Sequence, residues 1–386
     1  MSSPNAEHPF RISVPDAQLD LLRRKLELTT LSDELDDAGR DYGVPLSDIK
    51  RLLSRWKDGY DWRTHEAALN AQLPQFTRKI EVEGHGVLDI HYVHKRSEVD
   101  KAIPLLFVHG WPGSFIEVGK ILPKLVDGSG DHPSFHVVAL SLPGFGFSSA
   151  PTKMGFGVPQ YSEVAHKLML ALGYEEYVTQ GGDWGFYITQ TIAIKYGGTH
   201  SKAWHTNFPR TFDTLTDVEK TGLERSKWFH DLGRGYSTQQ RTQPQTLGYA
   251  LADSPVGLLA WIYEKLVNWT DSYPWEDDEV LTWISIFWFS KAGPAASLRI
   301  YYERRAVGWT YEAPKIPTGF SYFPQELIRV PAKWLKAGNL VFEAEHTAGG
   351  HFAAHEQPEL LVGDLRKMFG KEGPASGVVP GKGRYA

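Results

Sequence analysis

The feature that most constrains the fold is a series of short apolar segments that alternate with longer stretches of helical spacing. The apolar segments span residues 103–108, 135–140, 177–179 and 340–342, and the helix-like stretches span residues 116–125, 161–172 and 186–196. A strand that is apolar along its whole length is typical of a parallel sheet buried on both faces. The alternation therefore predicts an α/β fold class, with a mostly parallel sheet flanked by helices.

Two regions depart from this alternation. Residues 15–30 and 46–58 carry apolar side chains at helical spacing, and residues 77–93 carry them at alternate positions, which predicts an N-terminal helical extension and a hairpin. The tryptophan-rich stretch that follows Pro209 also looks helical, and it predicts an inserted cap. The predicted domains are an extension (1–95), the first part of the core (96–209), the cap (210–317), the second part of the core (318–370) and a loose tail (371–386).

The composition excludes several classes of function. The chain has 41 Lys and Arg against 46 Asp and Glu, a net charge of −5, which argues against nucleic acid as a partner. With no cysteine there is no disulfide, no thiolate nucleophile and no zinc–thiolate site, which suits a reducing cytoplasm. No export signal or membrane-spanning stretch is apparent, so we expect a cytoplasmic protein with no membrane partner. A homodimer is compatible with the sequence.

A glycine-rich pentapeptide, Gly-Gly-Asp-Trp-Gly, separates an apolar segment from a helical stretch and centres on Asp183. Small residues on both sides of the central position are what a nucleophile elbow requires, the sharp strand-to-helix turn of an α/β-hydrolase fold. Asp183 would then take the nucleophile's place. An Asp at the start of a helix is also a common N-cap, so the pentapeptide alone leaves both interpretations open.

The sequence His-Gly-Trp-Pro, which begins at His109, follows the first apolar segment of the predicted core. In an α/β-hydrolase, a backbone N–H of this loop and the N–H of the residue after the nucleophile bind an oxyanion. Trp111 and Trp184 would supply these two N–H groups. His109, Gly110 and Pro112 would support the loop.

The general base is expected near the C-terminus, because the chain order of this fold is nucleophile, acid, histidine. His351 lies there in Gly-Gly-His-Phe-Ala-Ala, and His109 is the alternative base. Glu326, just past a predicted strand, would orient the imidazole. Glu343 and Glu345 fall within the last predicted strand, where solvation or local pairing is expected.

Together with Tyr-Phe-Pro-Gln-Glu at 322–326, these motifs resemble those of the microsomal-type epoxide hydrolases, including soluble fungal and bacterial members. Residues 8–95 also resemble the N-terminal domain of that family. The resemblance implies an α/β-hydrolase fold with a nucleophilic Asp183, a charge-relay Glu326 and a general base His351. The membrane anchor of the microsomal members is not expected here.

The same resemblance implies two cap tyrosines that hold the epoxide oxygen. Within residues 297–303 the family pattern points to Tyr301, with Tyr302 as its rival. The position of the other tyrosine matches Tyr236.

The residue types agree with this chemistry. A carboxylate is ionised near neutral pH and can displace at a saturated carbon, and a phenol stays protonated and can donate to the leaving oxygen. The predicted reaction converts an apolar epoxide and water into a vicinal diol, through an ester on Asp183 that is hydrolysed by water activated by His351 and Glu326. It requires no metal and no organic cofactor. The alternatives are a haloalkane dehalogenase with the same Asp nucleophile and a non-catalytic hydrolase-like binding protein.

Overall fold

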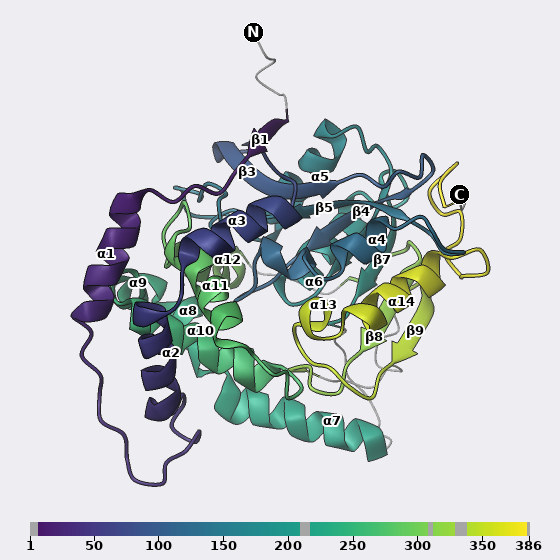
Figure 1. Cartoon of the computed structure of the whole chain (residues 1–386). Helices are drawn as coiled ribbons and strands as arrows, with labels where there is room; N and C mark the ends of the chain where they lie inside the picture. The colour runs from purple at the N-terminus through teal and green to yellow at the C-terminus, as the bar shows by residue number, and fades with distance from the viewer. Residues whose placement is uncertain (1–6, 209–216, 308–311, 329–337, 384–386) are drawn as a thin grey trace.

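The computed structural model describes residues 7–208, 217–307, 312–328 and 338–383, which form one nine-stranded sheet flanked by helices (Figure 1). The strand order is β1-β2-β3-β5-β4-β6-β7-β8-β9. The strands are β1 His8–Phe10, β2 Gln75–Val82, β3 Gly86–Lys95, β4 Ile103–Val108, β5 Phe135–Leu140, β6 Tyr177–Gly181, β7 Ser201–Thr206, β8 Thr318–Tyr322 and β9 Leu340–Glu345.

The sheet is mostly parallel, as predicted. The pairs β1–β2, β2–β3 and β3–β5 are antiparallel. All the other neighbouring strands, from β5 through β4, β6, β7 and β8 to β9, run parallel. Strands β4 and β5 are buried at every residue, as their apolar sequences predict. The predicted hairpin is β2–β3, and it continues the core sheet because Tyr92 of β3 pairs with Leu140 of β5.

The helices of the N-terminal and core regions are α1 Asp16–Glu27, α2 Leu46–Asp58, α3 Trp62–Gln72, η1 Phe115–Val118, α4 Leu122–Val126, α5 Val158–Ala171, α6 Trp184–Lys195, α13 Ala353–Glu356 and α14 Pro358–Phe369. One predicted helix is wrong, because residues 116–125 divide into η1 and α4. Gly119 and Pro123 lie where a continuous helix would have its middle, and both residues disfavour that position.

Residues 217–307 form a group of helices, here called the cap, and its Tyr236 and Tyr301 contact Trp111 and Trp184, which follow β4 and β6. Its elements are α7 Asp217–Trp228, η2 Phe229–Gly233, α8 Gly235–Thr242, α9 Pro244–Asp253, α10 Pro255–Trp269, α11 Asp277–Trp288, η3 Ala296–Leu298 and α12 Arg299–Val307. Residues 217–307 of the predicted cap are thus largely helical, whereas residues 312–317 contain no helix. The predicted boundary at 209/210 lies outside the described residues. None of the described helices has the length and apolar character needed to cross a bilayer.

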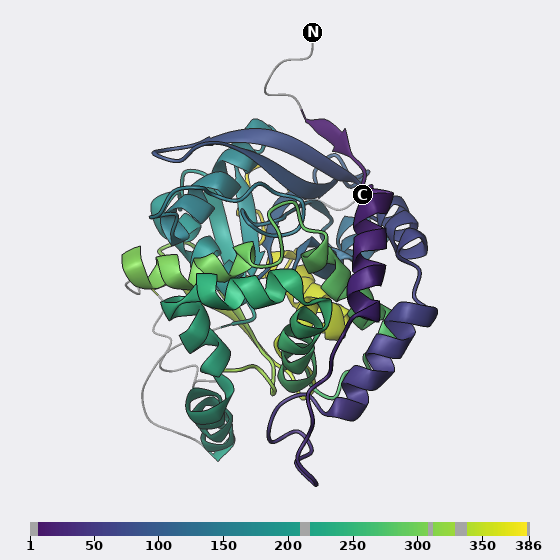
Figure 2. The same cartoon turned by 90° about the vertical axis from the view of Figure 1, so that its left-hand side faces the viewer.

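The N-terminal helices lie beside the cap (Figure 2). Helix α2 contacts α10 and α11, and α1 contacts α10. The Arg55 guanidinium binds both carboxylate oxygens of Asp278 at 2.7 and 2.8 Å, and Lys25 Nζ lies 2.6 Å from Asp253 Oδ1. The N-terminal region therefore joins the sheet through β3 and the cap through α1 and α2.

The C-terminal segment, predicted as a loose tail, has no helix or strand from residue 371 to 383, but part of it packs on the core. Ala375 and Val379 are buried in the core, and the Gly383 N–H donates to the Lys101 carbonyl at 2.8 Å. These small apolar side chains dock on the core without any periodic pattern that would reveal it in the sequence.

Candidate active site

Asp183 lies in the turn between β6 and α6, with φ 49° and ψ −119°. This is a strained backbone conformation for a residue with a side chain. A Cβ on Gly185 would overlap the Val108 carbonyl oxygen, and one on Gly181 would lie 2.7 Å from the Gly185 oxygen. The turn can form only because these positions are glycine, and it places the Asp183 side chain at the carboxyl edge of the sheet.

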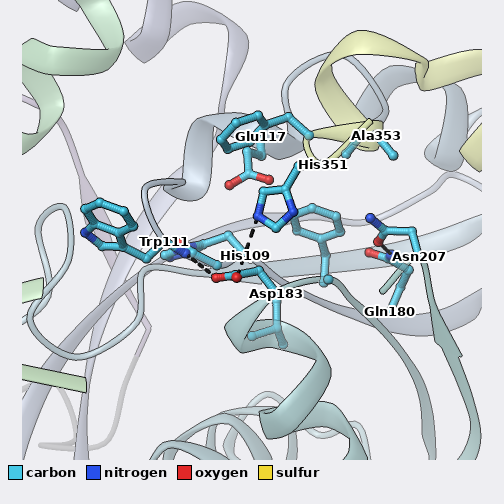
Figure 3. A pocket seen from close by; sticks show the side chains of 14 residues that line it. His109, Trp111, Glu117, Gln180, Asp183, Asn207, His351 and Ala353 are labelled. Carbon is cyan, nitrogen blue, oxygen red and sulfur yellow. Dashed lines mark hydrogen bonds and ion pairs between the residues drawn. The ribbon is translucent and has the colours of Figure 1, made fainter. Parts of the chain in front are cut away.

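The loop after β4 lies against the Asp183 carboxylate (Figure 3). The Trp111 N–H donates to Asp183 Oδ1 at 2.8 Å, and the Trp184 N–H also hydrogen-bonds this carboxylate. A Cβ on Gly110 would overlap the Asp183 side chain. The Pro112 carbonyl accepts a 2.6 Å hydrogen bond from Trp283 Nε1 of α11, which ties the loop to the cap. Both N–H groups expected from the sequence therefore point at one carboxylate.

His109 supports this loop. Its Nδ1–H donates to the Gly110 carbonyl at 2.9 Å, and its Nε2 accepts from the Leu142 N–H at 3.2 Å. Burial lowers the pKa of His109 to about 4, so the ring is neutral at physiological pH. With both ring nitrogens engaged, His109 has no free lone pair for water, which disfavours it as the base.

His351 lies between two carboxylates. Its Nδ1 is 2.6 Å from Glu326 Oε1, and its Nε2 is 3.6 Å from Asp183 Oδ2. Burial alone would lower the pKa of His351, but Glu326, then Asp183 and Glu117, raise it to about 9. Burial raises the pKa of Asp183, and the His351 charge and the two backbone N–H groups oppose that rise. The three residues thus have the geometry of a nucleophile, a base and a carboxylate that orients the base.

The two acidic alternatives to Glu326 lie elsewhere. Glu343 is on β9, where its Oε1 accepts a 2.8 Å hydrogen bond from the Tyr322 hydroxyl, and Glu345 is an exposed residue at the end of the same strand. The Glu326 Oε1 atom also accepts from the Leu327 N–H at 2.7 Å, which fixes the carboxylate toward His351.

The cap contributes Tyr236 from α8 and Tyr301 from α12. The ring of Tyr236 stacks on Trp111 at 5.1 Å, and the ring of Tyr301 meets Trp184 edge-on at 4.8 Å. The two tyrosine rings lie 5.8 Å apart. Burial raises the pKa of Tyr301 well above its ordinary value, helped by Tyr236 and by the Asp183 charge, so its hydroxyl keeps its proton. Tyr302 makes no such ring contact with the site in the part of the chain that the structure describes.

The cavity at Asp183 has a volume of about 20 Å³, enough for one water molecule. Three of its lining residues escaped the sequence analysis: Glu117 on η1, Gln180 near the end of β6 and Asn207 just after β7. Gln180 Nε2 donates to Asn207 Oδ1 at 2.8 Å. For Gln180 and Asn207, the available sequence signal was a polar residue at the end of a strand. For Glu117, it was an acidic residue between two apolar neighbours. Within the described ranges, no three side chains are grouped to hold a metal ion.

Comparisons with known proteins agree with this geometry. A family described as "Epoxide hydrolase N terminus" matches residues 7–118, and "alpha/beta hydrolase fold" matches residues 103–257. A "Putative epoxide hydrolase" of Stigmatella aurantiaca is 39% identical, over 94% of this chain and 84% of that protein. "Epoxide hydrolase 1" of Sus scrofa is 38% identical, over 94% and 88%.

Solved structures give the same result. The Aspergillus niger epoxide hydrolase superposes with a TM-score of 0.83 at 35% identity, covering 94% of this chain and 96% of that one. The juvenile hormone epoxide hydrolase of the silkworm Bombyx mori gives a TM-score of 0.85 at 27% identity, covering 94% and 93%. The predicted α/β-hydrolase fold is confirmed, and the likeness extends over the N-terminal region as well as the core.

Proposed function

This chain belongs to the epoxide hydrolase family, and from that premise we propose that it converts an apolar epoxide and water into a vicinal diol through an ester on Asp183. The observation that carries the proposal is the position of His351 between Asp183 and Glu326, with distances of 3.6 and 2.6 Å from its two ring nitrogens to their carboxylate oxygens. The apolar character of the substrate is inferred from the aromatic rings that the cap places over Asp183.

In the first step, Asp183 attacks one ring carbon. Its Oδ1 is held by the Trp111 N–H, so Oδ2 is the oxygen free to form the new bond. The ring C–O bond breaks, and the electron pair goes to the epoxide oxygen. That oxygen takes a proton from Tyr301 or Tyr236, because an alkoxide is a poor leaving group in an apolar site.

Formation of the ester changes the electrostatics of His351. The Asp183 carboxylate is one of the charges that raise the pKa of His351 to about 9, and that charge disappears when the ester forms. The pKa of the imidazole falls as a result, and its proton can pass to the tyrosinate left by the first step. His351 is then neutral, as a general base must be.

In the second step, His351 Nε2 takes a proton from water, and the hydroxide adds to the carbonyl carbon of the ester. The oxyanion forms on Oδ1, against the N–H groups of Trp111 and Trp184. The bond between this carbon and Oδ2 breaks, and Oδ2 takes the remaining proton of the added hydroxyl group as it leaves in the diol. Asp183 is then ionised and His351 protonated, as they were before the first step. The water oxygen remains in the Asp183 carboxylate.

A single turnover in ¹⁸O-water with enzyme in excess tests this scheme. The diol formed in the first cycle should carry no label, because its new oxygen comes from Asp183, and the label should appear in the peptide that contains this residue. Mass spectrometry of the diol and of the digested protein measures both. Label in the first-cycle diol would mean that water attacks the epoxide directly.

The cap tyrosines provide a second test. Tyr301→Phe should slow ester formation by about 10²-fold, within the range for loss of a positioned general acid, and the double change with Tyr236→Phe should nearly stop it. Rapid-quench measurement of ester formation checks this. Tyr302→Phe is the matched control, since its ring does not contact the site among the described residues. Ester formation at the normal rate in the double variant would remove both tyrosines from the mechanism.

The sequence alternatives differ in the support they receive. A haloalkane dehalogenase shares the Asp nucleophile, but the relatives and solved structures above are named epoxide hydrolases. A non-catalytic binding protein would not need the nucleophile, base and N–H donors held at reacting distance. A cytoplasmic location and a homodimer stay predictions.

A further inference from the structure

We propose that Glu117 is a positioning residue, which accepts a hydrogen bond from the hydrolytic water and directs that water at the ester of Asp183. The inference rests on the proposed function, because it assigns a residue to its second step. It concerns a side chain that the two-step scheme leaves unused, although it lines the same cavity as Asp183 and His351.

The Glu117 carboxyl group points into the cavity toward His351 and Asp183 (Figure 3). It comes from η1, directly after the loop that contacts Asp183, and the residue is only 8% exposed. A Cβ on Gly113 would overlap Glu117 Oε1, so the loop leaves room for this carboxyl group only because residue 113 is glycine.

Glu117 Oε1 is buried and has no hydrogen-bond partner among the residues described. Burial, with the nearby Asp183 charge, raises the pKa of Glu117 to about 8, although His351 and the Ser114 N–H act in the opposite direction. A buried acceptor left without a partner destabilises the folded protein, because it has given up its hydrogen bonds to water. The cavity of about 20 Å³ that Glu117 lines is large enough for one water molecule, which would supply the missing donor.

Two other buried glutamates of this chain show what a structural role looks like. Glu66 accepts from the Val14 N–H at 2.7 Å and from Trp62 Nε1 at 3.2 Å. Glu356 accepts from the backbone N–H groups of Asp271 and Phe352 at 2.9 and 3.1 Å. Both tie separate segments together, whereas no described side chain donates to Glu117 Oε1.

A water held by Glu117 and His351 would be oriented for attack. One of its protons would point at His351 Nε2, which removes it, and the other at Glu117 Oε1. The oxygen lone pair would then face the ester carbon of Asp183. Glu117 can accept this hydrogen bond whether or not its other oxygen is protonated, so it gains and loses no proton in the step.

Glu117→Gln tests the inference at nearly constant size. In the variant the amide oxygen would face the Ser114 N–H, and the amide N–H₂ group would face the cavity, where it donates to the water instead of accepting from it. We expect ester formation to change by less than about 3-fold and ester hydrolysis to slow by about 10²-fold, the usual cost of a misplaced reactant. Single-turnover rapid quench with mass spectrometry measures both rates, and the ester should accumulate.

Two further variants make the result specific. Glu117→Asp keeps a carboxyl group but withdraws it by one methylene, and it should slow the same step. Glu66→Gln is the matched control, with the same 8% exposure in the N-terminal region. It should lower the thermal unfolding midpoint and leave the ratio of the two rates unchanged.

The outcomes separate this inference from the proposed function. Ester hydrolysis at the wild-type rate in both Glu117 variants, or equal slowing of both steps, would overturn the role of Glu117. Absence of any covalent ester in every variant, with normal diol production, would instead overturn the two-step scheme on Asp183.

Discussion

Asp183→Asn should lose turnover by at least about 10⁴-fold and form no covalent ester in the first cycle. The amide has no ionised oxygen to attack a saturated carbon, and no other described carboxylate lies at the two N–H donors of Trp111 and Trp184. Substitution of an amide for the carboxylate keeps the shape of the turn, so the thermal unfolding midpoint should stay close to that of the wild type. Rapid quench with intact-protein mass spectrometry checks both parts.

The time course of activity shows whether any activity of the Asp183→Asn variant comes from reversion of the asparagine to aspartate. An asparagine in this position can revert to aspartate by hydrolysis, which would give activity that grows from zero during storage. Full activity from the first turnover, in protein whose mass shows that the introduced amide is intact, would rule out Asp183 as the nucleophile.

His351→Gln should also abolish steady turnover, but it should leave the first step in place. Glutamine cannot take a proton from water, so the ester on Asp183 has no base to hydrolyse it and should accumulate to one equivalent per active site. The enzyme mass should increase by the mass of the epoxide. Loss of steady turnover by about 10³-fold or more is expected, within the range for removal of a general base.

His346→Gln is the control for this variant. Its Nε2 lies 2.6 Å from Asp364 Oδ2, a partly buried pair that the site does not use, so the change should affect stability and leave hydrolysis of the ester intact. If His351→Gln formed no ester at all, the imidazole would be needed for alkylation, and its assignment to the second step would be wrong.

The sequence predicted the strands that are buried on both faces, because burial imposes an unbroken apolar pattern on segments such as β4 and β5. Strand β7 escaped because Ser201, Lys202, His205 and Thr206 interrupt any apolar run. Helix α3 escaped because it has only a weak apolar face, although the Asp61 side chain caps it by accepting from the backbone N–H groups of the first turn.

Some residues of the site can likewise be predicted from a local sequence pattern, and others cannot. Asp183 and His351 stand out because their glycine neighbours report a tight turn and a loop, which are local properties of the chain. Glu117 does not, since its place in the lining of the cavity depends on how the chain folds at η1. The meeting of Tyr236 and Tyr301 is likewise invisible to any local pattern, because two helices far apart in sequence bring them together.

The pairing of β3 with β5 makes the N-terminal region inseparable from the rest of the enzyme. Without the N-terminal region, the backbone N–H and C=O groups of β5 that pair with β3 would be unpaired at the edge of the sheet. The contacts of α1 and α2 with α10 and α11 would also be lost. A chimera that exchanged this region with that of a relative would have to preserve two interfaces. One is the main-chain hydrogen bonding between β3 and β5, and the other is the packing of α1 and α2 against α10 and α11. The two family matches, which overlap at residues 103–118, thus divide one continuous sheet.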